Sequence, residues 1–329
     1  MGASPRKSKS IARPESAVSR RRFLALAGIA ATGPFVHLRP AGAAKYTMKV
    51  AMVLTEADII CRATSKFKEF AEKKAGGDLE VQVYPNSALG SLRVTWESMQ
   101  LGNLEGGNWD TVTPAMMVPQ YAGTELPFVF RDLDHVHRVF DGPIGQDLEK
   151  QLLDRAKVRT VAVYDTTFRK IFTKTRPLNG LADMKGLKIR VPEAQNYVRC
   201  MQLLGANPTP VPWGELYTAL QMGVVEGFEN KAEAAYNAKL HEQAKFMAYT
   251  GHIFCPNPFL CSERWFSKLP KTIQQAIVEA GKESLAWQRA EAPVSEKAFE
   301  QRLKDAGVTF TSPDRAPFAE AVEPFYKEW

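Results

Sequence analysis

The chain has little of the residue chemistry that most enzymes and metal sites require. Among its 329 residues only five are histidine and four are cysteine. His135 and His137 are two positions apart, so they do not share a helix face, and no cysteine or acidic cluster accompanies them to make a zinc site. The sequence has no nucleophile elbow, phosphate loop, dinucleotide fingerprint, c-type haem pattern or iron–sulfur run of cysteines. These absences predict a protein that is not an enzyme and that holds no metal or cofactor.

The sequence also lacks a long hydrophobic run. Its apolar segment Leu24–Thr32 falls far short of the ~20 residues that a helix needs to span a bilayer. This segment follows SRRRFL at 19–24, a twin-arginine pattern, and precedes small residues at 41–44. Together they are typical of an export signal. We expect a twin-arginine signal peptide at 1–44, cleavage near Ala44 or Lys45, and a periplasmic mature protein.

The formal net charge of +7 comes from this leader. Residues 1–44 hold eight lysines or arginines and one acid, so the rest of the chain carries 35 basic and 35 acidic residues. An arginine-rich arm that binds nucleic acid is the alternative interpretation of the leader. The balanced charge of the remaining chain gives no support to nucleic-acid binding.

Strand-like and helix-like patterns alternate along the remaining ~285 residues. Alternation at 46–54 predicts a strand, and a helical stripe from Ile59 ends at Gly76-Gly77. A long helical pattern from Pro270 to about Lys304 contains Pro293, where we expect a kink. Further strands are expected at 79–83, 160–164, 168–173, 187–191, 224–228, 253–260 and 308–310, and helices at 91–101, 194–204, 214–221 and the C-terminus. This order predicts an α/β fold with mostly parallel sheets, covered by helices, whose ligands bind beyond the carboxyl ends of the strands.

All four cysteines follow the leader. Cys61 and Cys200 lie on apolar faces of predicted helices, where a buried free thiol is expected. The sequence does not decide whether Cys255 and Cys261 form a disulfide.

Two arginines lie in short apolar segments where strands are expected. Arg169 belongs to 168–173 and Arg190 to 187–191. A guanidinium is a planar fork that holds a carboxylate through two parallel hydrogen bonds. The pair therefore indicates a pocket for a small carboxylate. Structural arginines in strands are the alternative.

Two other candidates follow in the same stretch. Asn230 comes after the strand at 224–228, where its amide can donate to a ligand oxygen or act as a turn residue or helix cap. Trp213 precedes a helix, and either stacks on a ligand or fills a core. In the first half, Trp109 and Asp110 follow the glycine-rich loop Gly106-Gly107 and are expected to close over a ligand. Phe168 offers apolar surface beside the carboxylate.

The stretch 167–230 resembles the solute-binding proteins of tripartite ATP-independent periplasmic (TRAP) transporters, of the DctP type. The matching segments are FRKIFT, DMKGLKIRVP, LLGANPTPVPWGELYTALQMGVVEGFEN and, earlier, LPFVF at Leu126–Phe130. YTGH at 249–252 and its spacing to SERWFSKLP also look like the family. The resemblance covers nearly the whole mature chain.

The resemblance assigns roles to several residues. The arginine of the KIRVP block makes the main salt bridge to the solute carboxylate in that family, which points to Arg190. The upstream strand arginine, here Arg169, supports it. Asn230 matches an asparagine that contacts the ligand, and Trp213 matches a pocket-lining aromatic. The usual aspartate of the last block is Glu226 here, which keeps the charge.

The resemblance also implies a two-lobed periplasmic binding protein fold, type II-like, with a hinge and a long kinked helix that spans both lobes. The expected divisions are lobe I at 45–165 plus 256–293 and lobe II at 166–255 plus 294–329, with crossings near Asp165, Cys255 and Pro293.

The function implied is that of a monomeric solute-binding subunit. It captures a small organic acid in the cleft and delivers it to the membrane permease subunits of a TRAP transporter. A ligand-sensing partner of a membrane receptor kinase and an exported enzyme are alternatives from other classes. The aromatic candidates suit a sugar acid or an aromatic or cyclic acid. A C4-dicarboxylate would need a second cationic site, which the sequence does not reveal.

Overall fold

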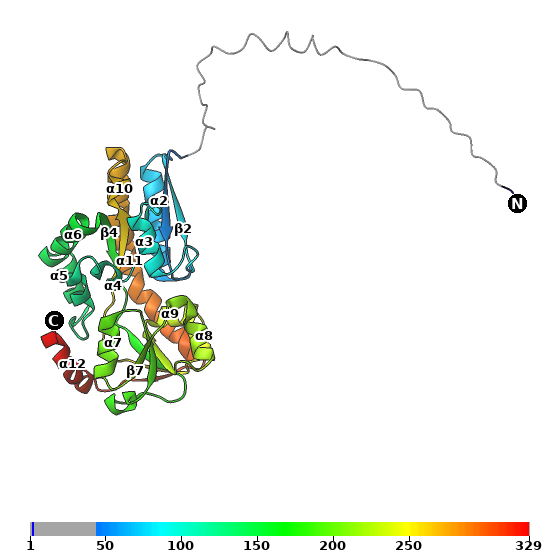
Figure 1. The fold of residues 1–329 in the computed structure, drawn as a ribbon, viewed down its shortest axis with the longest axis vertical. Coiled ribbons are helices and arrows are strands. Elements are labelled where there is room, and N and C mark those ends of the chain that lie inside the picture. The colour runs from blue at the N-terminus through cyan, green and yellow to red at the C-terminus, as the bar shows by residue number, and fades with distance from the viewer. Residues whose placement is uncertain (1, 3–43, 329) are drawn as a thin grey trace, which may run out of the picture. The chain divides into compact units, whose positions relative to one another are not determined.

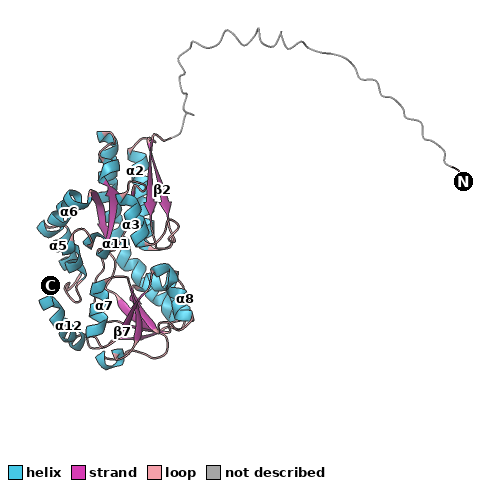
Figure 2. Cartoon of the chain, viewed as in Figure 1, coloured by secondary structure: helices cyan, strands magenta, loops and turns pink. Residues whose placement is uncertain are grey.

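The computed structural model describes residue 2 and residues 44–328, so the predicted signal peptide lies almost wholly outside the described residues. From residue 44 onward the chain builds two β-sheets flanked by helices (Figures 1 and 2). Between residues 44 and 328, no helix combines the length and the apolar character that crossing a bilayer demands. We call the first sheet with its helices lobe I and the second sheet with its helices lobe II.

The first sheet has the strand order β2-β1-β3-β10-β4. β1 runs parallel to β2 and β3, whereas β10 is antiparallel to β3 and β4. The strands are β1 (Tyr46–Ala51), β2 (Leu79–Tyr84), β3 (Gly106–Asn108), β4 (Val158–Tyr164) and β10 (Asn257–Ser262).

The second sheet has the order β11-β9-β5-β8-β6-β7. Its strands are β5 (Lys170–Thr173), β6 (Lys188–Val191), β7 (Asn207–Pro210), β8 (Gly227–Asn230), β9 (Phe246–Ala248) and β11 (Thr309–Thr311). The predicted two-lobed α/β fold is confirmed, but both sheets are mixed. Of the nine strand pairs among the described residues, five are parallel and four antiparallel. All four antiparallel pairs involve β5 or β10.

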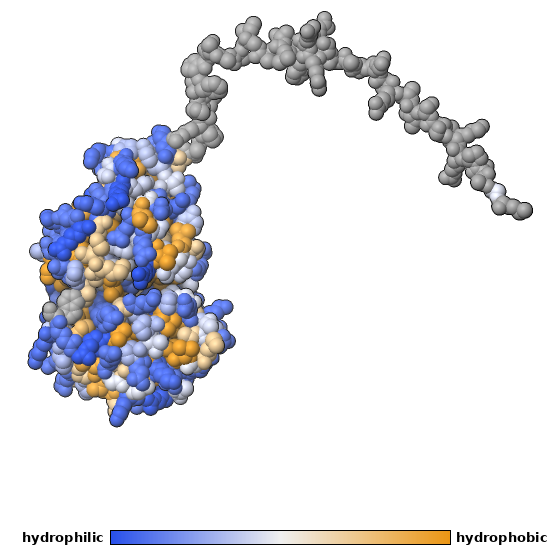
Figure 3. All heavy atoms as spheres, in the orientation of Figure 1, coloured by the Kyte–Doolittle hydropathy of each residue, from blue (hydrophilic) through white to orange (hydrophobic). Residues whose placement is uncertain are grey.

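The helices cover the two sheets, and several begin at the caps that the sequence provides. The side chains of Asp58 and Ser91 accept the backbone N–H groups of Ile60 and Val94 at the starts of α2 and α3. The helices are α2 (Ile59–Lys74), α3 (Leu92–Gln100), α4 (Val112–Ala115), α5 (Leu133–Phe140), α6 (Pro143–Ala156), α7 (Gln195–Leu203), α8 (Leu216–Gln221), α9 (Ala232–Asn237), α10 (Glu263–Phe266), α11 (Lys271–Asp305) and α12 (Ala316–Glu328). The view in Figure 3 shows mainly hydrophilic residues on the outside, with apolar ones in small separate patches.

The long helix α11 joins the two lobes. It packs against α2 and β4 of lobe I and against α9 of lobe II (Figure 1). Pro293 lies inside this 35-residue helix, which continues through it. Gly281 lets α11 approach β4 closely, because a Cβ there would lie 2.4 Å from the Val161 carbonyl oxygen.

Some predicted elements are shifted or differ in type. The Gly106-Gly107 pair forms the central strand β3 rather than a loop. A Cβ on these glycines would meet the carbonyl oxygens of Leu260 and Ala51 at 2.8 and 2.7 Å, so only glycine fits between the neighbouring strands. The strand predicted at 224–228 begins three residues later, which makes Asn230 its last residue.

All four cysteines are buried and free. The Cys255–Cys261 disulfide that the sequence left open therefore does not form in this structure. Burial raises the pKa of the Cys61 thiol to about 12, as expected for a cysteine that serves as a small apolar side chain.

We predict that Gly281→Val lowers the free energy of unfolding by about 3 kcal/mol, because the added side chain collides with the backbone of β4. Urea unfolding followed by circular dichroism measures the change. Gly180→Val is the matched control, since nothing lies within 4 Å of a Cβ at that position. Equal stability of the two variants would contradict close packing of α11 on β4.

Candidate functional site

Two adjoining cavities lie between the lobes at the carboxyl ends of several strands. The outer cavity has a volume of about 890 Å³ and the inner cavity about 100 Å³. Both lobes contribute to their walls, after β1 and β3 on one side and along β6 and β8 on the other. The residues that line both cavities are Val53, Leu92, Asp110, Arg190, Pro192 and Trp213. The position agrees with the general rule for ligand sites in α/β sheets.

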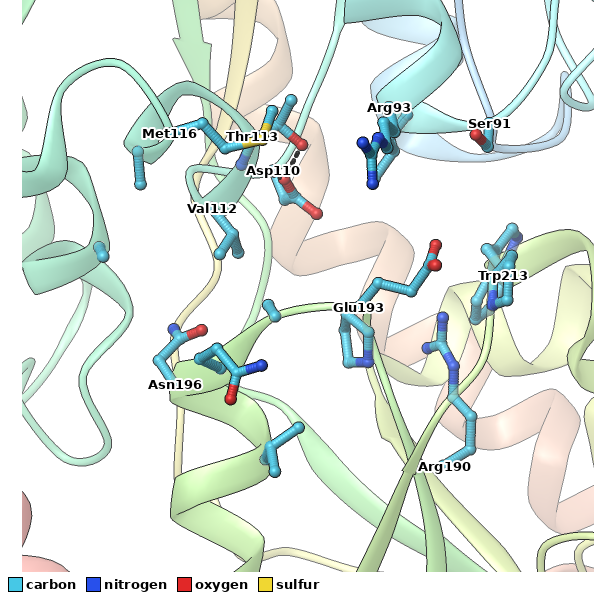
Figure 4. A pocket seen from close by; sticks show the side chains of 18 of the residues that line it. Ser91, Arg93, Asp110, Val112, Thr113, Met116, Arg190, Glu193, Asn196 and Trp213 are labelled. Atoms are coloured by element: carbon cyan, nitrogen blue, oxygen red, sulfur yellow. Dashed lines mark hydrogen bonds between the residues drawn. The ribbon is translucent and has the colours of Figure 1, made fainter.

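Arg190 is a buried cation that has no acidic side chain within ion-pair distance among residues 44–328. It lies in β6 with 3% of its surface exposed, and its Nε donates to the Val211 carbonyl oxygen at 2.8 Å. Its guanidinium carbon lies 5.7 Å from the centre of the Trp213 ring. Its side chain has no ion-pair partner among residues 44–328. Figure 4 shows its head pointing into the cavity between Trp213 and Glu193.

The surroundings of Arg190 disfavour its charge. Burial lowers the pKa of Arg190 to about 10; the nearby carboxylate of Glu229 opposes this shift in part, and the charge of Arg169 adds to it. The group still carries its charge at neutral pH. A buried charge that lacks a partner is unfavourable, so this wall is suited to an anion.

Arg169, by contrast, is already paired. Its Nε and Nη2 bind both carboxylate oxygens of Glu229, and Nη2 also donates to the Glu229 carbonyl oxygen at 2.8 Å. The Arg169 guanidinium carbon lies 5.2 Å from the centre of the Tyr197 ring, and His252 Nε2 lies 3.5 Å from Glu229 Oε2. Burial works to raise the pKa of Glu229, but Arg169 and His252 outweigh it and hold that pKa below its ordinary value. Both arginines line the inner cavity, and of these two described side chains Arg169 is held by Glu229 whereas Arg190 has no ion-pair partner.

Asn230 presents a free donor to the inner cavity. Its Oδ1 accepts the backbone N–H of Lys231 at 2.8 Å, which orients the amide. The Nδ2 group has no hydrogen-bond partner among the described residues, and Asn230 lines the inner cavity. The neighbouring Lys231 is buried, and its Nζ binds Asp58 Oδ1 at 2.7 Å. Lys231 is therefore a balanced charge.

Trp213 and Asp110 both line the two cavities. Trp213 lies in a 3-10 turn, Trp213–Glu215, and is half-buried; it lines the cavities and also packs against the apolar core of lobe II. Asp110 accepts the Thr113 N–H at 2.9 Å and the Thr113 hydroxyl at 2.7 Å. Burial raises the pKa of Asp110. Figure 4 places Asp110 on the opposite side of the cavity from Arg190.

Trp109 and Phe168 do not line either cavity. Trp109 is fully buried in lobe I, where its ring lies edge-on to Trp96 and its Nε1 donates to the Leu92 carbonyl oxygen at 3.0 Å. Phe168 packs edge-on against Phe254. Side chains alternate between the two faces of an extended segment. Since the residues on either side of each aromatic face the cavity, the aromatic itself faces away.

Two polar residues of lobe I that line the inner cavity, Asn108 and Asn257, have no signal in the sequence. Their positions depend on β3, where the sequence indicates a loop. Recognition of GGN as a strand would have indicated that Asn108 and Asp110 share a face. Among the described residues, no group of three or more histidine, cysteine or acidic side chains could hold a metal ion.

We predict that Glu229→Gln lowers the free energy of unfolding by about 3–5 kcal/mol at pH 7, because it leaves Arg169 buried without its partner. The lowered pKa of Glu229 means that its contribution is present above the unfolded-state pKa near ~4.3 and is lost as pH falls through the folded-state value. The difference between wild type and variant should therefore shrink below pH 4. Denaturant unfolding across pH tests this, with the exposed Glu320→Gln as control. A pH-independent difference would refute the role of the ion pair.

The sequence matches the family model described as bacterial extracellular solute-binding protein, family 7 (DctP), over residues 50–329. Among known proteins, the sialic acid-binding periplasmic protein SiaP of Vibrio cholerae is 30% identical over 283 residues. The match covers 86% of this chain and 88% of SiaP.

Solved structures agree with this assignment. A TRAP periplasmic solute-binding protein from Xanthobacter autotrophicus Py2 with bound β-D-galacturonate is 32% identical with a TM-score of 0.82. The match covers 85% of this chain and 94% of that one. One from Pseudomonas putida F1 with bound D-glucuronate is 29% identical with a TM-score of 0.82, covering 86% and 92%. The chain therefore belongs to the DctP family of bacterial extracellular solute-binding proteins, the solute-binding proteins of TRAP transporters.

Proposed function

We propose that this protein captures a small organic acid by its carboxylate between the two lobes and delivers it to the membrane permease subunits of a TRAP transporter. Solute-binding proteins of these transporters bind small organic acids and work with permease subunits. The single observation that carries the proposal for this chain is Arg190, a buried guanidinium on the cavity wall that lacks an acidic partner among the described residues.

The wall is prepared to bind a carboxylate with little rearrangement. The Val211 carbonyl fixes Arg190 Nε and the Trp213 ring lies beside its guanidinium, so the two terminal nitrogens remain for the ligand. Two parallel hydrogen bonds from these nitrogens match the two carboxylate oxygens. Asn230 Nδ2 supplies a further donor on the same lobe. Arg169 lies beside the proposed carboxylate position, but its Nε and Nη2 groups already donate to the Glu229 carboxylate. We therefore assign it a supporting role.

The charges on the cavity walls favour a solute with one carboxylate. Apart from Arg190, each basic side chain on the walls has an acidic partner: Arg93 with Glu97, Arg169 with Glu229, Arg199 with Glu328 and Lys231 with Asp58. Asp110 and Glu193 add two carboxyl groups to the same walls. The second carboxylate of a C4-dicarboxylate would meet no uncompensated buried cation there. The galacturonate and glucuronate bound by the two similar structures are also monocarboxylates.

Binding between two lobes couples the solute to lobe movement. The strands of lobe I come from 46–164 and 257–262, and those of lobe II from 170–248 and 309–311. This supports our division at 45–165 plus 256–293 and 166–255 plus 294–329, with hinge crossings near Asp165, Cys255 and the Pro293 kink. The solute favours the closed form only by the extra contacts that this form makes.

The site is built for binding rather than for turnover. Cys255 is the one cysteine on the described cavity walls, and burial raises the pKa of its thiol well above the ordinary value. A neutral thiol is a poor nucleophile. We infer that the solute leaves unchanged and that no cofactor takes part.

We further propose that the protein acts as a monomer in the periplasm and is exported by the twin-arginine pathway. The relative SiaP is a periplasmic protein by name. Replacing Arg20, Arg21 and Arg22 with lysine should leave the precursor in the cytoplasm of a host that has this pathway, because its receptor reads the arginines. Fractionation and immunoblotting measure the distribution. Normal export of the variant would contradict the proposed route.

Arg190→Ala is expected to weaken binding of D-galacturonate or D-glucuronate by about 2–5 kcal/mol, because it removes the buried partner of the carboxylate. Arg190→Lys should weaken it too, since a point charge cannot reproduce the fork. Isothermal titration calorimetry measures both. Arg199→Ala is the control, because this arginine at the outer cavity is paired with Glu328. Unchanged affinity of the Arg190→Ala variant would show that Arg190 does not bind the solute carboxylate.

The same residue gives an independent prediction without ligand. Arg190→Met should keep or raise the free energy of unfolding of the ligand-free protein, by up to about 2 kcal/mol, because it removes an unpaired buried charge. Thermal unfolding tests this. A large loss of stability would show that Arg190 serves the fold rather than a ligand.

A further inference from the structure

We propose that Asn108 and Asn257 form a hydroxyl-binding subsite on the lobe I wall of the inner cavity, so that the solute is a hydroxy acid. The proposal rests on the proposed function, because it assumes that Arg190 holds the carboxylate of the same solute. The new element is the hydroxyl group of the solute, which lobe I would recognise opposite Arg190 of lobe II.

Sheet register brings the two asparagines together. Asn108 is the last residue of β3 and Asn257 the first of the adjacent antiparallel strand β10. Asn108 pairs with Phe259, two residues after Asn257, so the two-residue period of a strand puts both asparagines on one face. Both line the inner cavity, which Arg190 and Asn230 line from lobe II. A solute that spans this cavity contacts the two asparagines of lobe I and the two lobe II residues at once.

The amide of Asn108 has one buried end that no described protein group satisfies. Only 5% of the residue is exposed, and its Oδ1 accepts the Thr64 hydroxyl at 2.9 Å. Its buried Nδ2 has no hydrogen-bond partner among the described residues. Such buried polar groups are rare in native proteins, because each one loses its hydration without replacement. A ligand atom at this wall would satisfy it.

Asn257 supplies the complementary group. Its Oδ1 is buried and likewise has no partner among the described residues. Asn108 and Asn257 thus offer one donor and one acceptor, both neutral. A hydroxyl both donates and accepts, so it can satisfy the two amides at once. A carboxylate only accepts and a methyl group does neither.

The Asp110 carboxyl group beside the two amides also favours a hydroxyl group on the solute. Asp110 lies two residues after Asn108 and lines the same inner cavity. A carboxylate there repels a second acid on the solute but accepts a hydrogen bond from a hydroxyl. The geometry therefore selects a solute with its carboxylate at lobe II and a hydroxyl at lobe I.

The test compares hydroxy acids with acids of similar size that lack hydroxyls. Isothermal titration calorimetry on the full protein uses D-galacturonate, D-glucuronate and D-gluconate against cyclohexanecarboxylate and hexanoate. We expect the tightest hydroxy acid to bind at least tenfold more tightly than either plain acid. A lost hydrogen bond that leaves a buried polar group unpaired accounts for about tenfold.

Variants assign the effect to the subsite. Asn108→Ala and Asn257→Ala should each weaken the tightest hydroxy acid about tenfold or more and leave the plain acids unchanged, whereas Arg190→Ala weakens every acid that binds. Asn103→Ala, an exposed residue on the loop before β3, is the control. Circular dichroism checks that each variant folds, and the comparison of acids on the wild-type protein needs no variant.

The outcomes separate the two proposals. If the plain acids bind as tightly as the hydroxy acids and Arg190→Ala weakens both, the hydroxyl subsite is wrong while the capture of organic acids stands. If both asparagine variants keep full affinity for the hydroxy acid, the subsite is also wrong. If no acid binds at all, the proposed function fails and the subsite fails with it.

Discussion

The unpaired charge of Arg190 is the constraint around which the cavity is organised. A guanidinium with 3% exposure and no acidic partner among the described residues destabilises the ligand-free protein. A backbone carbonyl and an indole ring offset part of that cost and fix the head in place. An anion beside the guanidinium would relieve the remaining imbalance, and we therefore attribute the proposed affinity for a carboxylate to this wall.

The other buried cations near Arg190 are paired with acids, which leaves them less available to a ligand. Glu229 neutralises Arg169, and Asp58 neutralises Lys231, although both cations line the inner cavity. Among the described residues, the walls thus hold several basic groups, of which Arg190 alone has no ion-pair partner. Across the inner cavity, the lining residues of lobe I include the amides of Asn108 and Asn257 and the carboxyl group of Asp110, but no cation. A solute that satisfies both walls has an acid at one end and a neutral polar group at the other.

The sequence indicated more of the cavity lining in lobe II than in lobe I. Arg190, Asn230 and Trp213 lie in a distinctive segment and line the inner cavity, while their contact with a ligand stays a prediction. In lobe I the sequence singled out Trp109, which the pleat of the chain turns into the core. The strand β3 has only three residues, two of them glycine, so local propensity gave no strand signal there. Without that strand the face shared by Asn108 and Asp110 could not be assigned.

The sequence by itself determined the α/β class, most helices and strands, and the presence of an arginine suited to a carboxylate, because these follow from local periodicity and side-chain chemistry. Only the tertiary structure decided which arginine is free. Arg169 finds Glu229 sixty residues later in the chain because β5 and β8 are neighbours in one sheet. Likewise, Asn108 meets Asn257 through the pairing of β3 with β10. Partners so far apart in the chain are set by sheet register, which no local pattern encodes.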